Sequence, residues 1–259
     1  MNRVHAVVRQ VDHRPWPLPK RPWVLRQRVH DLLFAHWPTS AGEMRRRLPR
    51  GLEIDTFDGD AWISLVAFRM SGVTLRWSPS LPGVSSFPEL NVRTYVRLGE
   101  KPGVYFFSLD AGSRIAVAVA RAWFHLPYHL ARMSLDVRAG MVHYTSLRCE
   151  TGAAVADFVA QYRAAGPEFH AQPGTLDHWL AERYCLHAAD RTGRMYFSEI
   201  HHMPWPLQPA EAEITCNTMA PPGVALPATP PRLQFSDALD IVAWAPRGVL
   251  GRRVGESSQ

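Results

Sequence analysis

The chain has 259 residues, 46% of them hydrophobic and 10% aromatic, and a formal net charge of +6. This length and hydrophobic content are enough for a sizeable core, in one large β-rich domain or two ordinary ones. The aromatic residues favour strands and lined cavities over a helical bundle. No apolar run reaches the ~20 residues of a membrane span, and residues 1–10 lack the apolar stretch of a secretory signal.

The positive charge is scattered along the chain, with one short run at residues 45–47. No groove-reading motif accompanies it, so we expect a protein that binds neither nucleic acid nor a membrane. Cys149, Cys185 and Cys216 are an odd number with no paired spacing, which favours a cytoplasmic location. The chain contains no recognised metal or cofactor motif, so we predict neither a metal nor a cofactor.

Residues 1–22 are polar and rich in proline, which predicts an irregular arm. Residues 23–247 contain no internal repeat and no break in composition, so they are predicted to form a single domain. The tail at residues 248–259 is predicted to be loose. Monomer and homodimer both remain open.

Alternating polarity and turn residues predict most of the strands. Ser40, with Glu43 three residues later, forms a capping box that begins a short helix. Residues 115–124 are rich in alanine and predict a helix buried against a sheet, and residues 175–183 also have helical spacing. The strands are predicted at residues 23–37, 52–57, 61–68, 87–96, 104–109, 133–138, 141–148, 156–163, 184–188, 194–201 and 238–244.

The strand at residues 87–96 carries the main functional signal. Its sequence, FPELNVRTYV, alternates, so Leu90 and Val92 share an ordinary core face with Thr94 and Val96. The opposite face combines a carboxylate, an amide, a guanidinium and a phenol with one aromatic ring. This polar face either meets water or lines a barrel interior, where it would hold a ligand. Its members are Phe87, Glu89, Asn91, Arg93 and Tyr95.

Other polar residues are candidates to join this face. The first strand places Arg28 and His30 on one side, together with Arg26 and Leu32, and we expect one of the first pair in the site. One of the neighbouring histidines at 201 and 202 must point inward, and His201 is our candidate. Tyr128 is predicted to line the pocket, and Tyr128 and Glu89 are the candidate acids or bases.

Several segments resemble a bacterial family of unknown function, the YqjF-like proteins. They are RPWVLRQRVHDLLFAHWP, LPRGLEIDTFDGDAW, FPELNVRTYV, FFSLDA and HMPWPL, and the likeness covers residues 23–244. The resemblance implies the acetoacetate-decarboxylase-like superfamily. We therefore expect a mainly β (α+β) fold, a curved, closed antiparallel barrel with a few short helices and a buried pocket.

Decarboxylases of that superfamily form an imine through a lysine that follows a proline. Here Pro127 matches the proline, and Tyr128 stands where the lysine would be. A phenol cannot form an imine, and the two lysines of the chain, Lys20 and Lys101, lie in a proline-rich arm and a predicted turn. The resemblance also implies an acidic residue on the pocket face of a central strand, a place that Glu89 occupies.

Three functions remain open from the sequence. The leading one is binding of a small anionic or carbonyl-containing organic molecule in the barrel, without Schiff-base chemistry. The second is a lysine-independent lyase, hydratase or isomerase that uses Glu89 or Tyr128 as acid or base. The third is an interaction module whose barrel is filled with side chains.

Overall fold

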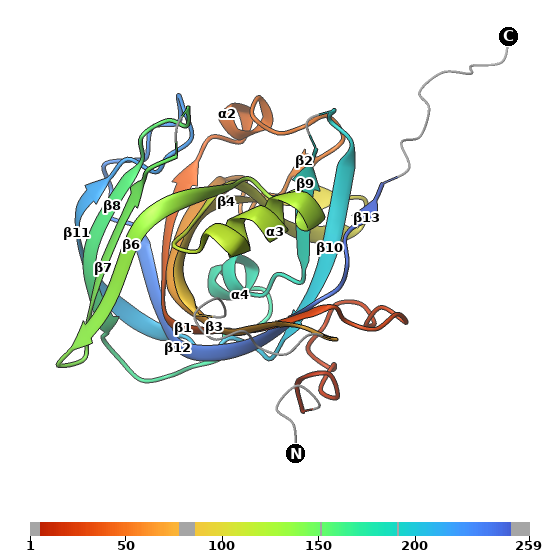
Figure 1. Ribbon diagram of the computed structural model, residues 1–259, viewed down its shortest axis with the longest axis horizontal. Coiled ribbons are helices and arrows are strands. Elements are labelled where there is room, and N and C mark those ends of the chain that lie inside the picture. Colours follow the sequence, from red (N-terminus) through yellow and green to blue (C-terminus); the bar gives the residue numbers. More distant parts are fainter. Residues whose placement is uncertain (1–5, 78–85, 151, 191, 250–259) are drawn as a thin grey trace, which may run out of the picture.

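The computed structural model describes residues 6–77, 86–150, 152–190 and 192–249 (Figure 1). Three helices in this part of the chain are α2 (Ala41–Arg45), α3 (Arg114–Phe124) and α4 (Leu176–Ala181). The strands are β1 (Leu25–Thr39), β2 (Glu53–Ile54), β3 (Ala61–Leu75), β4 (Phe87–Leu98), β5 (Lys101–Ala111), β6 (Tyr128–Arg138), β7 (Met141–Arg148), β8 (Asp157–Ala164), β9 (Cys185–Ala189), β10 (Met195–His202), β11 (Gln208–Asn217), β12 (Arg232–Ala243) and β13 (Arg247–Gly248).

All the strands belong to one sheet in the order β13-β10-β9-β5-β6-β7-β8-β11-β12-β1-β3-β4-β2. Additional β10–β12 and β4–β5 pairings close this sheet on itself. The predicted closed, mainly β barrel is therefore confirmed. One detail was wrong, since β5 pairs in parallel with both β6 and β9. For β6 the reason is α3, which connects the end of β5 to the start of this parallel neighbour.

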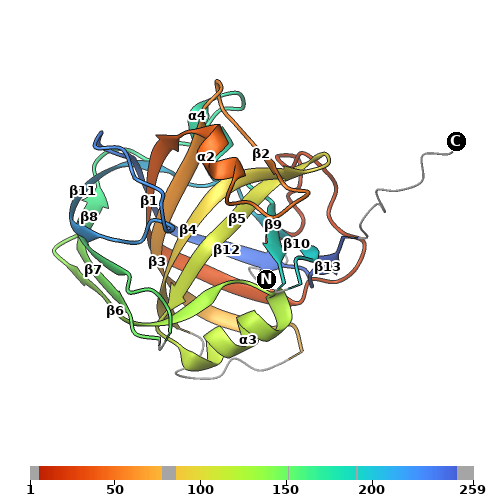
Figure 2. The same cartoon turned by 90° about the horizontal axis from the view of Figure 1, so that it is seen from above.

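The closed sheet encloses two hydrophobic cores. One circuit of pairings runs through β1, β3, β4, β5, β9, β10 and β12, and the other passes through β6, β7, β8 and β11. Figure 2 shows these last four strands on one side of the molecule and β9 and β10 on the other. The strands β1, β3 and β4 belong to both circuits, so both of their faces are buried. Val66 and Phe68 of β3 contribute to one core, and Leu65 and Ala67 contribute to the other.

A bulge in β1 reverses the direction of its side chains. Asp31 has φ +52°, and the register with β3 shifts between His30 and Leu33. Such an extra residue changes which face the following side chains occupy. Val29 and Leu32 therefore share one core although they are three residues apart, and Leu33 enters the other core. The simple alternation predicted along this strand was wrong from Asp31 onward.

The cap predicted at Ser40 is present, and several strands differ in extent from their prediction. Ser40 caps α2 by accepting a hydrogen bond from the Glu43 backbone N–H. The strand predicted at residues 52–57 is shorter than expected, since β2 covers two residues, and it pairs with β4. The strand β11 was not predicted. The strand predicted at residues 61–68 continues to Leu75 as β3, and residues 78–85 lie outside the described ranges.

The helix α3 is less buried than its alanine-rich sequence predicts. Only Val117 and Phe124 are buried, whereas Ile115, Val119 and Trp123 are exposed. In Figure 1 α3 lies across the interior seen through the ring of strands. No helix among the described residues is long and apolar enough to span a membrane.

The residues before β1 pack on the barrel instead of extending away from it. Val7 and Arg14 of this arm are buried. Arg14 donates a hydrogen bond of 2.6 Å to the carbonyl oxygen of Ile200 in β10, and Trp16 donates one of 2.7 Å to Glu199. The arm therefore covers part of β10. Residues 1–5 and most of the predicted tail, 250–259, lie outside the described ranges.

Candidate functional site

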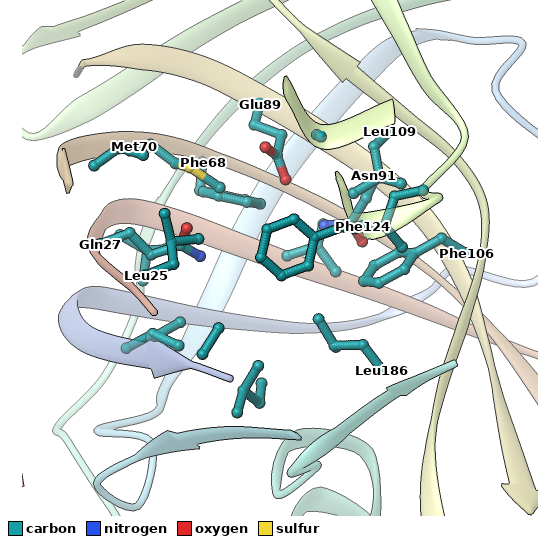
Figure 3. A pocket seen from close by; sticks show the side chains of 18 of the residues that line it. Leu25, Gln27, Phe68, Met70, Glu89, Asn91, Phe106, Leu109, Phe124 and Leu186 are labelled. Atoms are coloured by element: carbon teal, nitrogen blue, oxygen red, sulfur yellow. The ribbon is translucent and has the colours of Figure 1, made fainter. Parts of the chain in front are cut away.

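A cavity of about 190 Å³ lies inside the circuit that includes β9 and β10. Most of its lining is aliphatic or aromatic, with Phe68, Phe106 and Phe124 among the rings (Figure 3). The barrel is therefore hollow, in contrast to the solid packing that a filled interaction module requires. The polar side chains of the lining are those of Gln27, Glu89, Asn91, Arg93, Tyr128, Arg183 and His202.

The polar face of β4 is inside the barrel, away from bulk water. Glu89 and Asn91 are 2% and 5% exposed, and both point into the cavity in Figure 3. Their neighbours Leu90 and Val92 enter the second core on the other face of the strand. This position follows from the pleat, because β4 belongs to both closed circuits of strands and each of its faces is turned to the interior of one of them.

Glu89 and Tyr128 form a hydrogen-bonded pair in the cavity. The Tyr128 hydroxyl donates to Oε2 of Glu89 at 2.7 Å. Burial raises the pKa of Glu89 from 4.5 to about 8, and this hydrogen bond partly opposes the rise. Burial and the neighbouring carboxyl also raise the pKa of Tyr128. Near pH 7 the site therefore holds a neutral carboxylic acid, which is able to donate a hydrogen bond.

Arg93 is a cation without a carboxylate partner among the described residues. No hydrogen bond joins the side chains of Arg93 or Asn91 to that part of the chain, and the buried Nε of Arg93 and Oδ1 of Asn91 are unsatisfied there. The Arg93 guanidinium carbon lies 5.4 Å from the ring centroid of Phe34 and 5.9 Å from that of Tyr95. A partly buried guanidinium with an unsatisfied Nε and no acidic partner would gain from an anionic ligand.

The ionisable groups near Arg93 do not supply a negative charge that would neutralise it. His36 is fully buried, and desolvation, with Arg93 adding to it, lowers its pKa to about 3, so its ring is neutral. Arg183 donates to Oδ2 of Asp55 at 2.7 Å, so this second guanidinium already has an acidic partner. Arg93 is consequently available to pair with an anionic group of a ligand in the cavity.

Three predicted site residues lie outside the cavity, and these predictions are corrected. Arg28 forms an ion pair of 2.6 Å with Asp240, and His30 is 2.7 Å from the Ser71 hydroxyl. Gln27 and Val29 lie on the opposite face of β1 from these two residues, and it is this face that lines the cavity. His201 faces the arm, where its Nε2 donates to the Val7 carbonyl oxygen at 2.9 Å.

Three polar residues of the lining, Gln27, Arg183 and His202, were missed by sequence reasoning. Gln27 is on the face of β1 opposite to Arg28, and the strand pattern allowed either face to be internal. His202 was the alternative to His201, and the arm contacts decide between them. Arg183 follows α4 directly, and no local pattern distinguishes it from a surface arginine.

The two lysines are both remote from the cavity. Lys101 donates to Oε1 of Glu199 at 2.8 Å near the arm, and Lys20 belongs to the arm itself. Tyr128 occupies the cavity wall at the position where the resemblance predicts a lysine. Within the described ranges, no group of three or more His, Cys, Asp or Glu side chains is arranged to hold a metal ion.

The sequence profile of DUF2071, described as an uncharacterized conserved protein family, matches residues 26–240. The chain belongs to this family. It is 43% identical over 228 residues to the uncharacterized protein YqjF of Bacillus subtilis, and the match covers 88% of this chain and 93% of that protein.

Solved structures share the fold at much lower identity. Acetoacetate decarboxylase from Legionella pneumophila superposes with a TM-score of 0.60 at 14% identity, covering 92% of this chain and 93% of that one. The enduracididine biosynthesis enzyme MppR, in complex with pyruvate, gives a TM-score of 0.61 at 13% identity over 90% and 93% of the two chains. The acetoacetate-decarboxylase-like fold inferred from the sequence motifs is thus confirmed.

Proposed function

We propose that the barrel cavity binds a small organic anion through Arg93, and that it does so without imine chemistry. The observation that carries this proposal is the partly buried Arg93, whose Nε is buried and unsatisfied, whose guanidinium lies near two aromatic rings, and which has no acidic partner among the described residues. Its planar fork of N–H donors suits a carboxylate. A neutral Glu89 in the same cavity removes the repulsion that a second carboxylate would otherwise exert.

The comparisons lend support of a more general kind. MppR, which has the same fold, was solved with pyruvate, a small oxo acid. In this chain the residues available to an oxo acid are Arg93 for its carboxylate and the Glu89–Tyr128 pair for its carbonyl oxygen.

The three cysteines are free thiols, which supports a cytoplasmic setting.

Ligand-induced stabilisation tests this function. We expect small oxo acids at millimolar concentration to raise the melting temperature of the wild-type protein, because a ligand that binds only the folded state stabilises it. Arg93→Gln should abolish the shift. Arg28→Gln is the matched control, because Arg28 lies outside the cavity and should leave the shift intact. Equal shifts in both variants would contradict the proposal.

A second candidate function is acid–base catalysis by the same pair. It is favoured by the pKa of Glu89, raised to about 8, which allows this group to give or take a proton near neutral pH. Lyase, hydratase and isomerase reactions at a carbon next to a carbonyl use such a group. In a metabolite screen, turnover by the wild type that is lost in Glu89→Gln would support catalysis, and stabilisation without any product would support binding alone.

A further inference from the structure

Asn91 is an amide that the fold buries without giving it a hydrogen-bond partner. It is 5% exposed, and its side chain points into the cavity (Figure 3). Its Oδ1 is buried and unsatisfied, and no hydrogen bond joins either end of the amide to the residues that the structure describes. Buried polar groups are nearly always hydrogen-bonded in proteins, so this open amide indicates a role outside the fold.

The strands beside Asn91 explain why its amide has no partner. Asn91 lies opposite Val66 of β3 and opposite Leu109 of β5, and both of these side chains line the cavity. Directly opposed residues are the nearest neighbours on a sheet face, and neither side chain is able to form a hydrogen bond. On β4 itself, Glu89 already accepts from Tyr128. The sheet therefore places apolar neighbours on both sides of a polar group.

An apolar residue would serve the fold better than Asn91 does. Leucine branches at Cγ as asparagine does and has no polar atom. Replacing an unpaired buried polar group by an apolar group of similar shape is neutral or stabilising. Asn91 therefore lowers the stability of the ligand-free protein, as polar groups of binding sites commonly do.

A hydroxyl group of a ligand would satisfy this amide. The unpaired Oδ1 is an acceptor and needs a donor, which a carbonyl or carboxylate oxygen does not provide. A hydroxyl both donates and accepts, so it is able to bond to the amide oxygen or to the amide nitrogen. An ammonium group would also donate, but it would enter a cavity that already contains the Arg93 cation, and like charges repel.

We infer that the organic anion bound in the cavity carries a hydroxyl group, and that Asn91 is the residue that selects it. The hydroxyl rests on the proposed function, in which the carboxylate meets Arg93 and a carbonyl oxygen meets the Glu89–Tyr128 pair. The substrate class is therefore hydroxylated carboxylic acids, including hydroxy-oxo acids. A parent acid without the hydroxyl would exclude water from Asn91 and leave the amide unpaired, which lowers affinity.

Calorimetric titration of the full chain with matched pairs of acids tests the role of Asn91. The pairs are pyruvate with 3-hydroxypyruvate, 2-oxobutanoate with 4-hydroxy-2-oxobutanoate, and butanoate with 3-hydroxybutanoate. We expect at least one hydroxylated acid to bind the wild type at least about tenfold more tightly than its parent acid. Asn91→Leu should bind the two members of every pair equally. Gln161→Leu, which replaces an exposed amide of β8 in the same way, should keep the wild-type preference.

A second measurement separates ligand recognition from folding. Without ligand, Asn91→Leu should melt at the temperature of the wild type or above it, because the change removes an unpaired polar atom. A lower melting temperature would show that the amide supports the fold, and the hydroxyl inference would be overturned.

Two titration results would also overturn it while leaving the proposed function in place, provided that Arg93→Gln abolishes binding of the acids. They are equal affinities within every pair in the wild type, and a hydroxyl preference that persists in Asn91→Leu. If no acid bound in an Arg93-dependent manner, the proposed function itself would fail, and the hydroxyl inference with it.

Discussion

The Tyr128 hydroxyl lies 2.7 Å from Oε2 of Glu89, although the two residues are 39 positions apart in the sequence. The bond joins the beginning of β6 to the central strand β4 and holds a buried carboxyl at one end of the cavity. Neutral near pH 7, this carboxyl determines how both binding and stability should depend on pH.

Ligand affinity should fall as the pH rises through about 8. Below that value Glu89 is protonated and neutral, and above it the ionised carboxyl repels an anionic ligand bound in the same cavity. The dissociation constant of an oxo acid, measured between pH 6 and pH 9, should therefore increase over the upper part of this range in the wild type. Glu89→Gln should show a nearly constant value, and the exposed Glu211→Gln should behave like the wild type.

The stability of the ligand-free protein should also decrease as Glu89 is forced to ionise. Its pKa is about 8 in the folded protein and near 4.5 when unfolded, so the folded state binds more protons between these values. The contribution to the free energy of unfolding is fully present below pH 4.5 and is lost as the pH rises to about 8. Urea denaturation from pH 5 to pH 8.5 should show a steeper decline for the wild type than for Glu89→Gln, and parallel curves would contradict this assignment.

Removing the Tyr128 hydroxyl should destabilise the protein and raise the pKa of Glu89 further. Tyr128→Phe leaves Oε2 of Glu89 without its donor, at a cost of about 1–3 kcal/mol in the free energy of unfolding. The hydrogen bond lowers the pKa of Glu89, so its loss should shift the carboxyl titration upward in an NMR measurement. Tyr162→Phe, which removes a partly buried hydrogen bond of 2.7 Å to the Asp31 carbonyl oxygen, should destabilise the protein without moving that titration.

The bulge at Asp31 should be sensitive to side-chain branching. Its φ of +52° lies in the left-handed region, where aspartate and asparagine are tolerated better than β-branched residues. Asp31→Val should therefore lower the free energy of unfolding by about 1–2 kcal/mol, while Asp31→Asn, which keeps the local conformation, should cost less. Chemical denaturation of the two variants measures the difference, and equal losses would point to the Asp31–Arg69 ion pair instead.

Breaking the buried pair of Arg183 and Asp55 should destabilise the protein far more than breaking an exposed pair. Their side chains are 6% and 9% exposed, and their closest atoms are 2.7 Å apart. Asp55→Ala leaves a buried guanidinium uncompensated and should cost about 3–5 kcal/mol. Glu211→Ala breaks the exposed pair with Arg163 and should cost no more than about 1 kcal/mol. Similar losses of melting temperature in the two variants would refute this ranking.

Part of the site was predictable from local pattern. The alternation in residues 87–96 separates Glu89, Asn91 and Arg93 from the core-forming Leu90 and Val92, and the structure keeps that separation. The same reasoning was wrong for Arg28 and His30. In β1 both faces of the early part have mixed polarity, so the pattern did not indicate which face was internal.

Features that depend on near neighbours in the chain could be read without coordinates: the β-rich composition, the cap at Ser40, the division of β4 into two faces, and the motifs shared with the DUF2071 family. The tertiary structure decided which polar face is enclosed, because enclosure depends on the β4–β5 and β10–β12 pairings that close the sheet. It also decided that the arm covers His201 and that Tyr128 meets Glu89. Side-chain alternation is a property of a single strand, whereas a cavity exists only when strands distant in the sequence surround it.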